Sequence, residues 1–291
     1  MLTPIDIFAL IAVMLVGLPH GAFDGAIAFF LGAGRSAVRM MAFVIGYSLL
    51  AGLYVWFWYL APMPALAGFL ILSIIHFGSG DIQPLDPGPS AWAGKALKMV
   101  RIFTHGGVVG IVLPSLHPQE VARLYAVLTG GDAGPIMEIT GGLFPVWGAG
   151  FMVYLLAAIP YRMLRGAVFE IAILCGIAAF LPPLVGFAVY FCLVHSRRHF
   201  LVIWKAMQAM LSRQTILVTG FVLTIITWAG AGAAFYLQAD LAAVSKGDAA
   251  LRTVFVLLAA LTVPHMILVD SIFRPVLELS LIHISEPTRP Y

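Results

Sequence analysis

The sequence predicts an all-α protein, a polytopic bundle of seven to nine membrane-spanning helices. Of its 291 residues, 62% are hydrophobic and only 10% are charged, whereas a soluble domain carries about 25% charged residues. The mean hydropathy is +1.01. The apolar runs are long and unbroken, unlike the alternating strands of a membrane β-barrel. Helices are then the structure that satisfies its own backbone hydrogen bonds in lipid.

Apolar segments follow one another along the whole chain. A spanning helix needs about 20 apolar residues, so the short segments at 64–80 and 166–181 set the lower limit of the count. The N-terminus lacks a basic region and a cleavage site, so we expect the first segment to be retained as a span. The nine segments are 5–30, 38–60, 64–80, 97–115, 142–160, 166–181, 184–208, 214–238 and 252–273.

The connections between these segments indicate a single domain. Residues 81–96 contain three prolines, and residues 116–141 contain the run Gly130-Gly-Asp-Ala-Gly-Pro135. Both connections are long enough to carry some independent structure. Neither has the size of a soluble domain. We expect residues 1–279 to form one integral-membrane domain and the polar residues 280–291 to be a non-native or disordered tail.

Lysine and arginine residues indicate how the chain sits in the membrane. Positive charge gathers on the cytoplasmic side of membrane proteins, which favours nine spans in the cell inner membrane with the N-terminus outside and the C-terminus inside. The net charge of +3 needs no nucleic-acid partner, because no basic stripe or binding motif is present. The residues that set this orientation are Arg35, Arg39, Lys95, Lys98, Arg101, Arg162, Arg165, Arg197, Arg198, Lys205 and Arg274.

A pair of histidines in the seventh segment predicts half of a metal site. His195 and His199 are four residues apart, so their side chains share one helix face with Cβ atoms about 5–6 Å apart. Ionisable groups are costly inside so apolar a span and point to function. Arg197 and Arg198 point away from this face, and we expect them to extend to the cytoplasmic interface.

Four more histidines fall at the same depth, in the cytoplasmic halves of other spans: His20, His76, His105 and His265. Imidazole binds metals in its neutral form, so such a set costs little in lipid before a metal arrives. Each one taken singly is better explained as a hydrogen-bonding residue between helices than as a ligand. His117 lies on the opposite side and His283 lies in the tail, so neither is included.

Two carboxylates lie close to these histidines in the sequence. Asp24 is four residues after His20 and is expected to accept a hydrogen bond that orients its ring. Asp81 could do the same for His76, although we expect it to be a loop carboxylate at the interface. The aromatic run from Tyr54 to Tyr59 is expected to form an interfacial belt, and Cys175 and Cys192 are expected to be small buried residues.

The available ligand types narrow the chemistry. There is no H-E-x-x-H motif, so a zinc protease would lack its general base. A metal site with two histidine ligands and one carboxylate ligand remains possible if Asp24 or Asp81 is a ligand. The excess of histidine favours a ligand set made only of imidazoles. Such a set suits Fe(II) with open positions for O₂. A substrate that reaches a site buried among spans is expected to be lipid-soluble.

Five motifs in this order resemble the Brp/Blh family, which comprises bacterial and archaeal β-carotene 15,15′-dioxygenases associated with supplying retinal to microbial rhodopsins. The resemblance extends from about residue 5 to 274. In this sequence Gly25 stands where the family often has a second histidine after the aspartate, which places one supporting contact in doubt. The motifs are Gly17-Leu-Pro-His-Gly-Ala-Phe-Asp24, Ile75-His-Phe-Gly78, Thr104-His-Gly-Gly107, His195-Ser-Arg-Arg-His199 and Pro264-His-Met266.

The resemblance implies an Fe(2+) site at His20, His76, His195 and His199. It assigns supporting or substrate-lining roles to His105 and His265, and Asp24 is expected to support the ligands. The implied reaction joins O₂ to the central double bond of β-carotene, or of a related carotenoid, and gives two all-trans-retinal molecules. The retinal would pass to a microbial rhodopsin, and the metal would lie toward the cytoplasmic half of the bilayer.

Two other functions remain open on the sequence. A di-iron membrane desaturase or hydroxylase also uses clustered histidines, but it would carry further H-x-x-H-H boxes, and this chain has a single H-x-x-x-H. A metal-ion transporter would favour broken helices with carboxylates along a path, and acidic residues are scarce here. The iron content, one or two per chain, would separate the dioxygenase from the di-iron enzyme. Metal transport without O₂ consumption would indicate the transporter.

Overall fold

The computed structural model describes residues 2–82, 91–241 and 244–273, and its regular elements within these ranges are all helical. This confirms the predicted fold class. The helices and helical turns, in chain order, are α1 (Pro4–Ala12), η1 (Val13–Gly17), η2 (Leu18–Phe23), α2 (Asp24–Phe30), η3 (Ala33–Arg35), α3 (Ala37–Leu60), α4 (Pro62–Asp81), α5 (Ala91–Gly107), η4 (Val108–Val112), α6 (Leu113–Leu116), α7 (Pro118–Thr129), α8 (Gly134–Ala157), η5 (Arg162–Leu164), α9 (Arg165–Phe180), α10 (Pro183–Ala188), η6 (Val189–Ser196), α11 (Arg197–Gln208), α12 (Arg213–Tyr236), η7 (Leu237–Leu241), α13 (Lys246–Met266) and η8 (Ile267–Phe273).

Eight helical segments within the described residues are long and apolar enough to cross a membrane. They are α1 to α2, α3, α4, α5 to α6, α8, η5 to α9, α12 to η7, and α13 to η8. The remaining predicted segment, 184–208, the seventh in chain order, is also helical and forms α10, η6 and α11. It is less apolar than the other eight because it carries two histidines, two arginines and a lysine.

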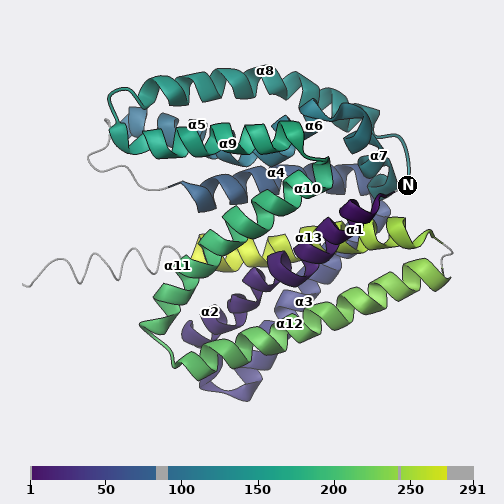
Figure 1. Cartoon of the computed structure of the whole chain (residues 1–291). Coiled ribbons are helices and arrows are strands. Elements are labelled where there is room, and N and C mark those ends of the chain that lie inside the picture. Colours follow the sequence, from purple (N-terminus) through teal and green to yellow (C-terminus); the bar gives the residue numbers. More distant parts are fainter. Residues whose placement is uncertain (1, 83–90, 242–243, 274–291) are drawn as a thin grey trace, which may run out of the picture.

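The oblique helix α10–η6–α11 joins two groups of helices (Figure 1). The first group contains α5, α8 and α9, and the second contains α2, α3 and α12. At its beginning α10 contacts α6 and α9, and at its end α11 contacts α2 and α12. The histidine-bearing stretch therefore lies between the two groups, where side chains from both can reach it.

One predicted boundary was wrong in the segment between α6 and α8. The connection at 116–141 carries structure of its own, the helix α7, but α8 begins at Gly134 rather than near residue 142. Gly130 ends α7 in the left-handed conformation, with φ 72°, as glycine does after many helices. Pro135 then lies in the first turn of α8, where its missing N–H costs nothing. The glycine and proline residues of this run thus end one helix and begin the next.

Helices α4 and α5 approach each other unusually closely. A Cβ atom on Gly78 of α4 would overlap the backbone carbonyl oxygen of Ile102, and one on Gly106 of α5 would overlap that of Ile74. Small residues allow such backbone contact between helices in membranes. This crossing fixes the position of α4, which carries His76 and Asp81.

The aromatic run 54–59 is only partly an interfacial belt. Trp56 and Tyr59 are exposed as expected, but Trp58 is buried, and its indole N–H donates to the carbonyl of Leu128 at 3.1 Å. The contact comes from α7, which the prediction did not include. Cys175 and Cys192 are both free thiols, the first half-buried and the second buried. The predicted tail 280–291, His283 and Arg274 lie outside the described residues.

Candidate active site

Four buried histidine rings from four elements gather into one cluster, to which α4, η6, α11 and α13 contribute His76, His195, His199 and His265. The centroid of the His76 ring lies 4.9 Å from that of His195, 5.0 Å from that of His265 and 6.1 Å from that of His199. The His199 and His265 rings are 5.0 Å apart, and the His195 and His199 rings are 6.1 Å apart. The structure therefore brings three of the predicted ligands together and adds His265, for which a supporting role was expected.

His20 belongs to the same region of the chain but stays untested. Its backbone lies in η2, and its side chain lies outside what the structure describes. The residue beside it, Gly21, faces the cluster, because a Cβ atom there would be 3.9 Å from Nδ1 of His265.

Helical turns that depart from the α-helix lie around the histidine cluster. The π-helical turn η6 carries His195, and the π-helical turn η8 begins two residues after His265. The first span also changes from α1 to the π-helical η1 and then to the 3₁₀-helical η2, where Pro19 occupies the first turn. Interruptions of this kind are common at functional sites because they turn side chains away from the regular α-helical face.

Each of three histidine rings has a carboxylate at its Nδ1 atom. Asp24 oxygens lie 2.9 Å from Nδ1 of His265, and Asp270 Oδ2 lies 3.1 Å from Nδ1 of His76. Asp81 Oδ1 lies 3.7 Å from Nδ1 of His195, within ion-pair range. A neutral imidazole that donates its Nδ1 proton keeps a lone pair on Nε2. Carboxylates placed in this way are typical of metal-binding histidines, whose rings they orient.

The Nε2 atom of His76 supplies a further test of whether the residues suit a metal. It is fully buried and has no hydrogen-bond partner among the described residues. A buried polar atom without a partner is costly, and a metal ion would accept its lone pair. The donor set and the carboxylates thus fit a metal bound by imidazole. No group of three or more donors within the described ranges has the distances of a formed metal site, so the complete ligand set stays a prediction.

The structure corrects the predicted place of Asp81. It is the last residue of α4 and is buried, not a loop carboxylate at the interface. The Tyr190 hydroxyl donates to its Oδ2 at 2.8 Å, and Arg198 approaches its Oδ1 at 3.3 Å. The buried charge is tolerated because these donors surround it. Its histidine neighbour is His195 rather than His76.

Arg198 also has contacts that its prediction did not include. Besides the exposure expected of it, its guanidinium has carboxylate partners, because it donates to both oxygens of Glu170 at 2.9 and 2.8 Å and contacts Asp81. A planar guanidinium suits such paired contacts. Arg197 is exposed, as expected. Asp24 likewise has a second donor, the Tyr47 hydroxyl at 2.7 Å.

Sequence reasoning missed Asp270 and Glu170. Asp270 follows His265 by five residues, a spacing that shares a face in a π-helical turn but not in an α-helix. Glu170 lies in α9, far along the chain from both of its partners. His105, for which a supporting role was expected, lies elsewhere, between α5 and α8, where its Nε2 is 3.4 Å from the Tyr154 hydroxyl.

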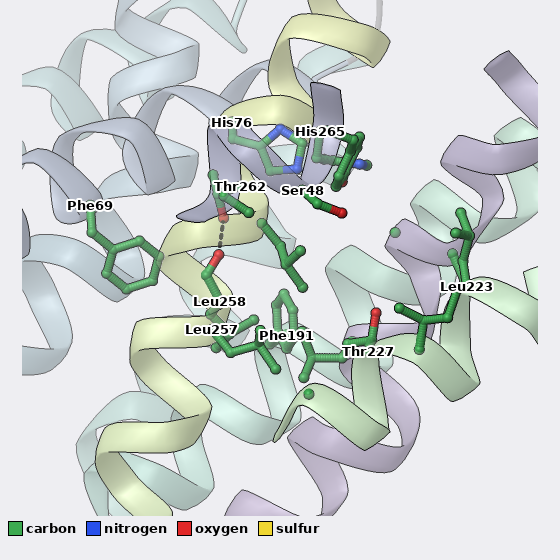
Figure 2. Close-up of a pocket in the computed structure, with 18 of the residues that line it drawn as sticks. Ser48, Phe69, His76, Phe191, Leu223, Thr227, Leu257, Leu258, Thr262 and His265 are labelled. Carbon is green, nitrogen blue, oxygen red and sulfur yellow. Dashed lines mark hydrogen bonds between the residues drawn. The ribbon is translucent and has the colours of Figure 1, made fainter. Parts of the chain in front are cut away.

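A cavity of about 240 Å³ lies beside two of the clustered rings. Figure 2 shows His76 and His265 together on one side of it, with Phe69 and Leu223 toward opposite ends. Most of the other lining residues are apolar, and the polar ones are Tyr47, Ser48, Thr227 and Thr262. Lining residues from α3 and α12, among them Ser48, Ile226 and Gly230, are exposed on the outer surface of the bundle. The cavity therefore opens toward the lipid and suits an apolar molecule.

Comparison with known proteins shows the family of the chain. The family described as "Beta-carotene 15,15'-dioxygenase" matches residues 11–273. The chain belongs to this family. The match includes every described residue of the histidine cluster and all three carboxylates beside it. No solved structure was found that matches the chain.

Two curated relatives carry the same family description. The chain is 40% identical over 277 residues to the beta-carotene 15,15'-dioxygenase of an uncultured marine bacterium (66A03), covering 93% of this chain and 95% of the relative. It is 28% identical over 207 residues to the probable beta-carotene 15,15'-dioxygenase Blh of Halobacterium salinarum, covering 64% of this chain and 58% of that relative. The resemblance noted from the five motifs is thereby confirmed.

Proposed function

We propose that this chain cleaves the central 15,15′ double bond of β-carotene with O₂ and releases two all-trans-retinal molecules. The observation that carries the proposal is the cluster of buried histidines at the side of a lipid-facing cavity, in a chain of the beta-carotene 15,15'-dioxygenase family. Both atoms of one O₂ molecule end in the two aldehydes, so the reaction needs no external reductant and no net proton. This suits a buried site without a nicotinamide or flavin motif.

We further propose that His20, His76, His195 and His199 hold Fe(2+), which when bound would supply the activation of O₂. His265 would stand beside these ligands, with its ring fixed by Asp24 at 2.9 Å. Asp270 and Asp81 would fix the rings of His76 and His195 in the same way. The protein would thus hold a rigid set of imidazoles and exclude water from the polyene, and it would contribute position rather than acid–base catalysis.

The cavity supports a route for the substrate from the bilayer. An apolar polyene would enter between α3 and α12, where Ser48, Ile226 and Gly230 are exposed, and lie with its centre beside His76 and His265. We propose that the protein works in the cell inner membrane with this site toward the cytoplasmic half, and that retinal leaves by the same lipid-facing opening toward a microbial rhodopsin.

Expression in cells that accumulate β-carotene tests the proposed reaction. The wild-type chain is expected to bleach the cells and to produce retinal, whereas a His195→Ala chain present at the same level in the membrane is expected to do neither. Extracted pigment measured by chromatography would show both. Unchanged β-carotene with folded wild-type protein would contradict the proposal, as would retinal formation by the His195→Ala protein.

Replacing Asp270 by asparagine is expected to weaken iron binding by about 10–100-fold, the usual effect of losing a carboxylate that supports a ligand. The amide would keep the shape of the carboxylate but not the charge that faces Nδ1 of His76, a proposed ligand. Iron retained after titration with a chelator measures the effect. Asp132→Asn, at an exposed position in the turn before α8, is the matched control and should bind iron like the wild type. Equal affinities in all three proteins would exclude this role for Asp270.

A further inference from the structure

We propose that a second apolar cavity, behind a wall of three phenylalanines, receives one half of the carotenoid during cleavage, and that Phe187 is the movable part of this wall. The proposal rests on the proposed function and concerns how one site accommodates both halves of its substrate. The second cavity has a volume of about 50 Å³ and lies between α4, η4, α7 and α10.

The two cavities share their dividing wall. Phe69, Phe77 and Phe187 line both the cavity beside the histidines and the second one. On the second side, the other lining residues are apolar except for Ser73 and Tyr125. A hydrocarbon ring with no hydrogen-bonding group fits such a lining, because it leaves no polar atom of its own unsatisfied.

The symmetry of the cleaved molecule requires room on both sides of the histidines. β-Carotene has equal halves on either side of its central bond, and Figure 2 places His76 and His265 between the Phe69 end and the Leu223 end of the first cavity. The half toward Leu223 can extend to the lipid between α3 and α12. The half toward Phe69 meets the phenylalanine wall, and the space beyond that wall is the second cavity.

The volumes show that the wall must move. The first cavity, about 240 Å³, is smaller than the 300–1,000 Å³, roughly, of sites for drug-sized ligands, so it does not enclose a whole carotenoid. The second, as it stands, is too small for a substituted ring. Rotation of one aromatic side chain would join the two cavities into a longer channel.

Phe187 is better placed to move than Phe77. Phe77 packs against His195, with ring centroids 4.5 Å apart, and against Tyr190 at 5.5 Å, so its displacement would disturb the site. Phe187 instead stacks on Phe191 at 5.4 Å and lies 5.3 Å from Phe255. It lies in α10, a helix of six residues that continues into the wide turn η6.

The test fills the second cavity and compares a whole with a shortened substrate. Leu124→Trp places an indole in the second cavity from α7, and Leu156→Trp makes the same change on the exposed face of α8. The substrates are β-carotene and an apocarotenal that keeps one ring and the central double bond but lacks the other ring. Leu124→Trp is expected to lower kcat/KM for β-carotene by about 10-fold or more, the scale on which a pocket rejects a misfitting apolar group. Turnover of the apocarotenal by this variant, and of both substrates by Leu156→Trp, should match the wild type.

Two further measurements keep the result interpretable. Phe187→Ala is expected to raise the ratio of β-carotene to apocarotenal turnover, since it opens the wall. Binding of β-carotene to the chelator-treated protein, read from the absorbance retained after gel filtration, should fall in Leu124→Trp and not in Leu156→Trp. Equal losses for both substrates in Leu124→Trp, or an unchanged ratio in Phe187→Ala, would overturn the proposal. If the wild type makes no retinal from either substrate, the proposed function fails, and the binding comparison still decides for or against the second cavity.

Discussion

Replacing His76 by alanine is expected to abolish retinal formation, with a loss of at least about 100-fold, beyond the effect usual for residues that only support a ligand. His76 is at the centre of the described cluster, since its ring lies within 6.1 Å of the three other rings. Its Nε2 atom is buried without a partner in the described chain, and its Nδ1 atom faces Asp270. Its removal would delete an imidazole donor and leave the Asp270 carboxylate without its histidine.

His105→Ala is the matched control for this variant. His105 is as buried as His76, but its ring contacts Tyr154 between α5 and α8 and lies outside the cluster. We expect this variant to keep most of its iron and at least about a tenth of its activity, because the loss of one neutral hydrogen bond costs about 0.5–1.5 kcal/mol. Iron per chain, measured by metal analysis, and retinal yield should therefore separate the two variants. Equal losses in both would mean that burial, not membership of the cluster, explains the effect.

The sequence was sufficient for the fold class because lipid removes most alternatives. Long apolar runs must be helices, and their number follows from their length. The i, i+4 spacing of His195 and His199 also predicted a shared face, which the ring positions confirm. The start of α8 was predicted too late because glycine and proline end and begin helices as readily as they form loops.

The partners of the histidines could not be predicted in the same way. Local spacing suggested Asp24 for His20 and Asp81 for His76, whereas the described contacts join Asp24 to His265 and Asp81 to His195. These pairs depend on how spans far apart in the sequence pack, and on π-helical turns that no regular period reveals. A carboxylate near a histidine in the sequence therefore indicated a residue that contacts the histidine cluster, but it named the wrong ring for Asp81.

The position of α4 depends on a backbone contact that only glycine permits. At Gly106 the nearest atom to an added Cβ is the carbonyl oxygen of Ile74, and at Gly78 it is that of Ile102. Neither atom belongs to a side chain that could rotate away. Any larger residue must separate α4 from α5. Because Ile74 and Gly78 lie two residues on either side of His76, this separation would also move the histidine.

Gly106→Leu is therefore expected to destabilise the protein by more than the roughly 1–3 kcal/mol of ordinary overpacking, and to abolish activity in whatever protein still folds. Gly148→Leu, in α8, is its matched control, because a Cβ atom there meets nothing within 4 Å. Thermal unfolding in detergent is measured as the fraction of protein that stays monodisperse. Its midpoint temperature is expected to fall sharply for Gly106→Leu and to stay near the wild-type value for Gly148→Leu. Gly106→Ala should lie between them, since one methyl group already overlaps the carbonyl. A Gly106→Leu protein with wild-type stability and retinal yield would show that α4 and α5 do not cross this closely.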